Sequence, residues 1–87
     1  MSKEEIFAAL EHLRNGEFRP GNDMEMAHEI CQRHEGEAMF DWLHALVHRV
    51  EGDQSNADYW YRRSGHPRHD GPVADEWEII HEAAHKA

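Results

Sequence analysis

Cysteine and long apolar runs are scarce in this 87-residue chain. Cys31 is the single cysteine, so no internal disulfide can form, and a reducing compartment is expected. No apolar run approaches the roughly 18 residues that span a bilayer, which excludes a transmembrane helix. The acidic start of the chain also lacks the apolar segment of a signal peptide. These absences predict a cytoplasmic protein that does not bind membranes.

Basic residues are also few: the chain has nine Lys and Arg and 18 Asp and Glu. Its net charge is therefore −9 when the histidines are neutral. Binding to phosphates needs a basic surface, so nucleic acid is not an expected partner. Four arginines nevertheless fall close together, and they either form a local positive patch or, as helical spacing favours, pair with nearby carboxylates. The arginines are Arg49, Arg62, Arg63 and Arg68, and the carboxylates are Glu51, Asp53 and Asp58.

The alternation of apolar and polar residues that is typical of strands is missing. Helix-capping and helix-breaking residues divide the chain into five short helical segments. Ser2 with Glu5 and Asn22 with Glu25 are capping boxes that open the first two helices. These helices are expected to end near residues 15 and 34. Gly36 either breaks the chain or bends one continuous, kinked helix.

The third helix is predicted at residues 37–51 and the fourth from residue 54 to residue 63 or 64. Gly52 is suited to a left-handed residue after the third helix, and Asp53 is suited to cap the fourth, so the two helices form a sharp hairpin. A loop at residues 66–72 precedes a last helix from about Val73. The apolar stripe of the third helix is Phe40, Leu43, Leu46, Val47 and Val50.

Apolar stripes on short helices predict one all-α domain over residues 1–87, either an antiparallel bundle or tetratricopeptide-like helical hairpins. Trp42 lies about 100° from the centre of its stripe, so it either packs on the fourth helix or belongs to a dimer surface. The consecutive Tyr59, Trp60 and Tyr61 cannot all face one core. This excess of aromatic surface favours a homodimer, a protein partner or a small ligand.

Nine histidines are the main peculiarity of the composition. His44 and His48 are four residues apart and Glu51 follows three later, so all three project from one side of a helix, and His28 on the preceding helix can join them. Such a set can bind a divalent metal, zinc or iron. The alternative is a buried network of neutral histidines that hydrogen-bond to Glu29, Glu51 or a tyrosine hydroxyl.

The last predicted helix contains HExxH, the zinc-binding pattern of metalloproteases, from His81 to His85. That chemistry needs a third ligand, usually downstream, where only Lys86 and Ala87 follow. Glu-x-x-His pairs also begin at Glu78 and Glu82, but di-iron bundles carry such pairs on separate helices. An exposed helix face is the favoured interpretation.

A dense pattern of polar and aromatic residues runs through the middle half of the chain. Its core is EGDxxNAxYWYRR at residues 51–63, followed by Gly65 and preceded by Ala27, His28, Glu29, Gln32, Trp42, His44, Ala45, His48 and Arg49. This pattern resembles a family of small bacterial and fungal proteins, which usually has Ala where Ser64 stands, and the resemblance implies no established activity. Residues 56–63 are also similar to the second helix of tetratricopeptide-like repeats, which implies scaffolding more than catalysis.

The sequence therefore favours a non-enzymatic helical binding module without a cofactor, which uses the third and fourth helices. The alternative is a metal-binding protein, with hydrolysis as one use of the metal, whose ligands are His28, His44, His48 and Glu51. The candidate binding residues are Trp42, His44, His48, Glu51, Asn56, Tyr59, Trp60, Tyr61, Arg62 and Arg63.

Overall fold

The computed structural model describes residues 3–87, which form five α-helices and no strand. The helices are α1 (Lys3–Asn15), α2 (Asn22–Arg33), α3 (Ala38–Glu51), α4 (Gln54–Ser64) and α5 (Val73–Lys86). The predicted all-α class is therefore confirmed. No helix in the described part of the chain is both long and apolar enough to cross a membrane.

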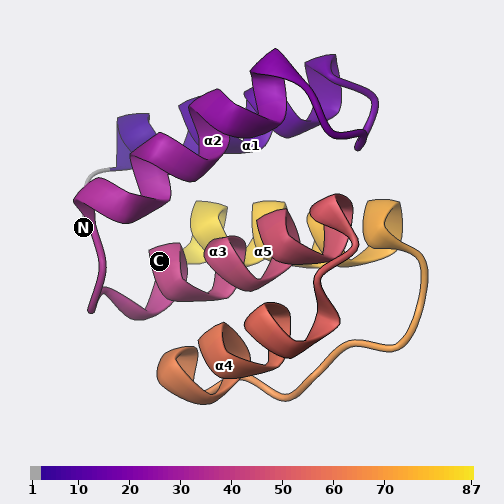
Figure 1. The fold of residues 1–87 in the computed structure, drawn as a ribbon. Helices are drawn as coiled ribbons and strands as arrows, with labels where there is room; N and C mark the ends of the chain where they lie inside the picture. Colours follow the sequence, from indigo (N-terminus) through magenta and orange to yellow (C-terminus); the bar gives the residue numbers. More distant parts are fainter. Residues whose placement is uncertain (1–2) are drawn as a thin grey trace.

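The helices are stacked in three layers (Figure 1). α1 and α2 form one outer layer, α3 and α5 lie side by side in the middle, and α4 covers α3 from the other side. α3 contacts all four other helices, and ten of its 14 residues are buried. Buried polar side chains on this helix therefore need hydrogen-bond partners within the protein or a bound ligand.

The core is built from the apolar stripes that the sequence shows. Every member of the α3 stripe, from Phe40 to Val50, is 9% exposed or less. Each such side chain contributes about 1.5–3 kcal/mol by leaving water, which fixes the facing sides of these short helices. Cys31 is fully buried, and burial raises the pKa of its thiol, so it packs as a small apolar residue.

The turn between α3 and α4 has the predicted geometry. Gly52 is left-handed with φ 89°, and the backbone N–H of Asp53 donates to the carbonyl of His48 at 2.9 Å. The Asp53 side chain then accepts the backbone N–H of Asn56 at 3.2 Å and caps α4. The hairpin places the histidines of α3 against the aromatic residues of α4.

The start of α2 differs from the prediction. Asn22 is not a cap but the first residue of the helix, and Gly21 takes the capping position without a side-chain hydrogen bond. Gly21 has φ 154°, a conformation that suits glycine, and its carbonyl accepts the N–H of Glu25 at 3.0 Å, so the helix begins one residue earlier. Ser2, the other predicted cap, lies outside the described residues.

Two separate helices flank Gly36, which agrees with one of the two predicted alternatives. α2 ends at Arg33 and α3 begins at Ala38, so a continuous kinked helix is wrong. Gly36 has φ 96° and donates its N–H to the buried Asp41 carboxylate at 3.1 Å. This short turn folds α2 back over α3 and brings His28 above the α3 histidines.

Candidate metal centre

Three histidines from two helices converge on one point. His28 comes from α2, and His44 and His48 lie one turn apart on α3. One nitrogen of each lies within 4.8 Å of a nitrogen of the others. The i,i+4 spacing on α3 supplies two of the three, and the packing of α2 on α3 supplies the third.

The rings are arranged so that their nitrogens point inward. The Nε2 atoms of His28 and His44 are 3.0 Å apart and share one hydrogen bond. Two imidazoles bound to one zinc ion hold their nitrogens about 3.3 Å apart, so a small separation of these rings would fit a metal. The rings of His44 and His48 are stacked with centroids 5.0 Å apart, and His28 is edge-on to both.

Two histidines of the cluster are buried, and the pKa values of two are lowered. His44 is 2% exposed and His48 is 7% exposed. Burial, assisted by the neighbouring His28 and His48, lowers the pKa of His44 to about 3. Burial and then His48 also lower the pKa of His28. Neutral imidazoles keep the nitrogen lone pairs that a metal ion needs, and competition from protons is weak at neutral pH.

One nitrogen of the cluster has no partner. His44 Nδ1 is buried and has no hydrogen-bond partner among residues 3–87. A buried polar atom left in this state costs about 1–3 kcal/mol, so a histidine network held together only by its own hydrogen bonds is incompletely satisfied. The predicted hydrogen-bonded network is present only in part: His48 contacts Glu51, but neither Glu29 nor a tyrosine hydroxyl hydrogen-bonds to the described histidines of the cluster.

Carboxylates lie at the edge of the cluster. His48 Nδ1 donates to Glu51 Oε1 at 3.0 Å, and one oxygen each of Glu51 and Asp53 lies within 4.8 Å of His48 and of one another. Asp53 is occupied by capping, since it also accepts Asn56 Nδ2 at 2.7 Å, and these bonds from Asn56 lower its pKa. Glu51 is exposed and is therefore the carboxylate that is free to respond to a bound cation.

The aromatic residues of α4 form one wall of the cluster. Trp60 stacks on His44 with centroids 3.8 Å apart and is 8% exposed. Arg63 lies over the Trp60 ring at 5.2 Å and donates to the Tyr59 hydroxyl at 3.0 Å. Tyr59 is 42% exposed, so this pair forms the outer rim of the wall.

Two of the predicted binding residues lie away from the histidines, around a carboxylate that the sequence analysis missed. Glu76 of α5 is 1% exposed and accepts Trp42 Nε1 at 3.0 Å, Arg49 Nη1 at 2.7 Å and the Tyr61 hydroxyl at 2.6 Å. Trp42 also stacks on His66, in the loop that precedes α5, and is only 8% exposed. The side chains of Trp42, Arg49 and Tyr61 are therefore directed toward the buried Glu76 carboxylate.

Glu76 had a recognisable signal in the sequence. It stands four residues before the fully buried Ile80, on the apolar face of its helix. A carboxylate in that position must be paired, and Arg49 and Tyr61 carry the donors. Burial and the bond to Glu76 raise the pKa of the Tyr61 hydroxyl, which stays protonated.

The predicted pairing of the arginines with nearby carboxylates holds for one of the four. Arg68 lies 3.7 Å from Asp58 and 3.2 Å from Asp70. Arg49 pairs with Glu76 instead, because it points into the core and not along the surface. Arg63 contacts aromatic rings, and Arg62 has no ion pair or hydrogen bond with any described residue.

The HExxH segment does not form a three-ligand set within residues 3–87. His81 stacks on Trp77, and His85 lies against Phe7 with centroids 4.6 Å apart. Glu82 is exposed and pairs with Lys86 at 3.0 Å. These residues cover the contact between α1 and α5.

Comparisons with protein-family models, with curated proteins and with solved structures found no match for this chain. The resemblance carried by residues 51–63 therefore stays a prediction. The function of the protein is inferred from the geometry of the site.

Proposed function

We propose that this chain is a metal-binding protein that holds one divalent transition-metal ion, zinc or iron, on His28, His44 and His48. The observation that carries the proposal is the convergence of three mostly buried imidazoles from two helices. Imidazole is a common ligand of zinc, copper, iron and nickel, and three such ligands leave an open coordination position.

Glu51 orients a ligand in this proposal. Histidines that bind metals usually donate their second N–H to a carboxylate or carbonyl, which fixes the tautomer. The hydrogen bond from His48 Nδ1 to Glu51 leaves the other nitrogen, Nε2, for the metal. Glu25, Glu35 and Glu51 also act electrostatically on His28, so the surroundings of the cluster attract a cation.

The proposal extends to binding and not to a named reaction. An open position on a metal held by three histidines suits water activation, so hydrolysis stays the alternative use of the site. Glu51, the exposed carboxylate next to His48, is then the candidate proton acceptor.

The binding-module prediction now depends on fewer residues. Trp42, Trp60 and Tyr61 are each 8% exposed or less within one chain, so only Tyr59 of the four aromatic residues is exposed. The surface excess that favoured a homodimer is accordingly smaller. The homodimer and the cytoplasmic location stay predictions of the sequence.

Metal analysis of untagged protein tests the proposal. After growth with added zinc and iron, the purified protein should contain about one equivalent of one of them. His44→Ala and His48→Ala should lose the metal, whereas His85→Ala, which removes a histidine outside the cluster, should retain it. Glu51→Gln should weaken binding about 10–100-fold by removing the carboxylate that orients His48.

Circular dichroism of each variant separates loss of the ligand from loss of the fold. A wild-type protein that holds less than about a tenth of an equivalent, and fails to bind added zinc or iron in a competition titration, would refute the site. Equal losses in His85→Ala and His44→Ala would show that the metal binds elsewhere.

A further inference from the structure

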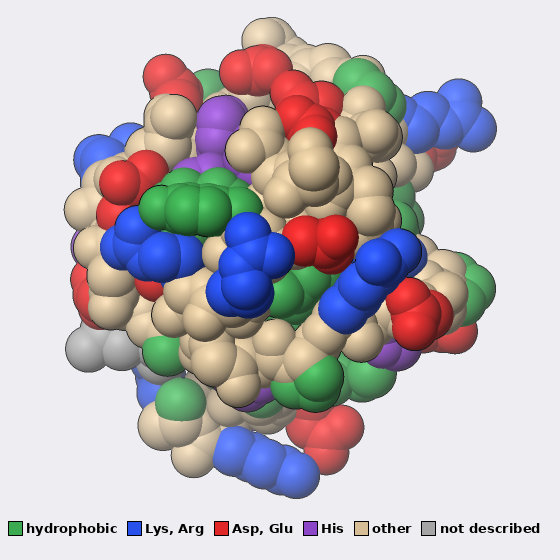
Figure 2. Space-filling view, turned by 60° about the horizontal axis from the view of Figure 1, so that its bottom comes forward, with side chains coloured by type: hydrophobic (Ala, Val, Ile, Leu, Met, Phe, Trp, Pro, Cys, Tyr) green, Lys and Arg blue, Asp and Glu red, His purple; other side chains and the backbone are tan. Residues whose placement is uncertain are grey.

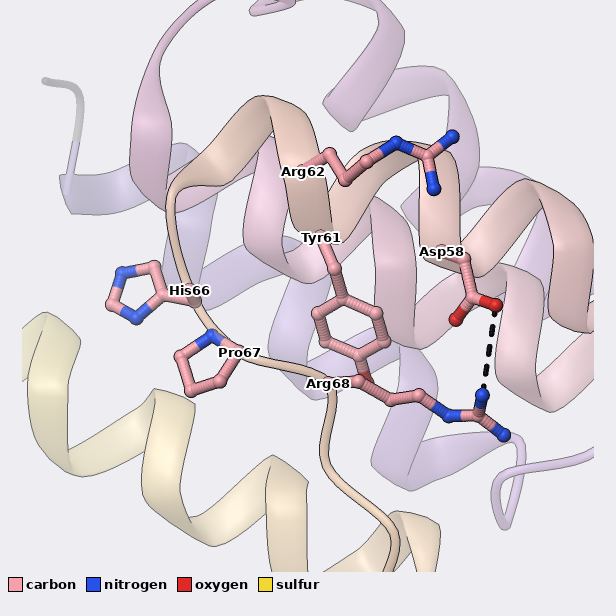
Figure 3. A pocket seen from close by; sticks show the side chains of 6 residues that line it. All are labelled: Asp58, Tyr61, Arg62, His66, Pro67 and Arg68. Carbon is pink, nitrogen blue, oxygen red and sulfur yellow. Dashed lines mark ion pairs between the residues drawn. The ribbon is translucent and has the colours of Figure 1, made fainter.

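A second hollow lies next to α4, formed with the segment that follows it. Its volume is about 290 Å³, and its walls come from α4 and from residues 66–68 (Figure 3). The lining residues are Asp58, Tyr61, Arg62, His66, Pro67 and Arg68. None of them belongs to the histidine cluster, so this hollow is a separate place for a ligand.

One guanidinium without an ion pair among the described residues lies at this hollow although the protein as a whole is acidic. Arg62 is exposed and has no ion pair or hydrogen bond among residues 3–87. Arg68 pairs with Asp70 at 3.2 Å and also faces Asp58 across a longer contact of 3.7 Å, which Figure 3 shows as a dashed line. Figure 2 shows basic side chains on this face, with acidic side chains between and beside them and apolar atoms near them. Arg68 is therefore balanced by two carboxylates, whereas Arg62 has no carboxylate partner among residues 3–87, so the Arg62 charge is the one left open to an anion.

The floor of the hollow is apolar and rigid. The Tyr61 ring points into it between the arginine side chains (Figure 3), and its hydroxyl is tied to the buried Glu76 at 2.6 Å. Pro67 adds a second apolar ring whose backbone angle is fixed. A flat ring beside guanidinium groups suits a ligand that joins a charged group to a planar or apolar body.

We propose that this hollow binds a small oxyanion, a carboxylate or phosphate group on a planar or apolar body. Arg62 makes the main contact, because its planar guanidinium offers two parallel donors to an oxyanion and has no competing partner. Arg68 is the second donor: it exchanges the 3.7 Å contact of its Nη1 with Asp58 for the ligand and keeps its Nε pair with Asp70. The Tyr61 ring packs against the body of the ligand. The proposal does not depend on the metal site.

Amide NMR titrations of metal-free protein test the proposal with three probes: inorganic phosphate, phenyl phosphate and benzoate. Constant ionic strength keeps general screening fixed. Saturable shifts are expected at residues 58–68, and phenyl phosphate should bind more tightly than inorganic phosphate by several-fold because of its ring. The relative affinities of phenyl phosphate and benzoate distinguish a phosphate site from a carboxylate site.

Arg62→Gln is the test variant and Arg19→Gln the matched control. Both arginines are exposed and lack an ion pair among the described residues, so both changes remove one positive charge from the surface. Arg62→Gln should weaken binding of phenyl phosphate about tenfold, and Arg19→Gln should leave it unchanged. The proposal is overturned if no probe gives saturable shifts at residues 58–68, or if the two variants lose affinity equally.

Discussion

The buried Glu76 carboxylate shows how one residue organises three helices. Its oxygens accept donors from Trp42 and Arg49 of α3 and from Tyr61 of α4, while its own backbone belongs to α5. A carboxylate at 1% exposure is tolerated because these donors replace the water that it loses. The same bonds fix the position of the Tyr61 ring, so the residue supports the proposed anion site from below.

Glu76→Ala is expected to destabilise the protein by about 3–5 kcal/mol, because it leaves the mostly buried guanidinium of Arg49 without its carboxylate. Urea denaturation followed by circular dichroism measures the loss. Glu78→Ala is the matched control, since Glu78 is exposed on the same helix, and its effect should stay within about 0.5 kcal/mol. Similar stabilities of the two variants would contradict the role given to Glu76.

At the scale of elements, the α3–α4 hairpin determines which side chains form the site. The left-handed Gly52 reverses the chain in one residue, and Asp53 starts α4 at once. Trp60 is thereby laid on His44 at 3.8 Å, and the Arg63–Tyr59 pair follows on the same side. A longer or differently directed turn would move this wall away from the histidines.

Gly52→Val is expected to lower the melting temperature by several degrees. A Cβ at this position meets no atom within 4 Å, so the cost is the strain of a branched residue at φ 89°, about 1 kcal/mol or more. In a domain of this size each kcal/mol shifts the melting temperature by about 4–8 °C. Gly52→Asn should cost less, because asparagine tolerates left-handed angles. Thermal unfolding of both variants checks the order, and an unchanged melting temperature for Gly52→Val would contradict the strained turn.

For the whole molecule, the central position of α3 means that a metal would join two layers. His28 belongs to the α1–α2 layer, whereas His44 and His48 belong to the middle layer (Figure 1). A metal ion bound by all three would oppose separation of these layers. Ligand binding of this kind stabilises only the folded state, and its size follows from the concentration and the dissociation constant.

Zinc at about 100 times its dissociation constant should therefore raise the free energy of unfolding by about 2.7 kcal/mol. The melting temperature should rise by about 10–20 °C and return when a chelator is added. Differential scanning calorimetry on wild type and on His44→Ala makes the measurement, and only the wild type should respond. A wild type that binds zinc without any rise would show that zinc binds the unfolded chain equally well, which contradicts a site assembled by the packing of the two layers.

Local signals in the sequence were enough to predict much of the fold. The apolar stripe of α3, the end of α3 at Gly52 and the cap at Asp53 all agree with the structure, whereas the sequence left the break at Gly36 open. Each depends on a spacing or a backbone preference within a few residues, which folding elsewhere does not change. The pairing of His44 with His48 is local for the same reason, since one helical turn separates them.

The tertiary structure alone decided which distant residues meet. It brought His28 Nε2 to 3.0 Å from His44 Nε2, directed Trp42, Arg49 and Tyr61 to Glu76, and left Arg62 without an ion pair among residues 3–87. These outcomes depend on how α2 and α5 pack on α3, and that packing balances many small apolar contacts and buried hydrogen bonds along the whole chain. The sequence by itself therefore determined where helices begin and end and which faces are apolar, while the packing of those faces decided which polar side chains became a site.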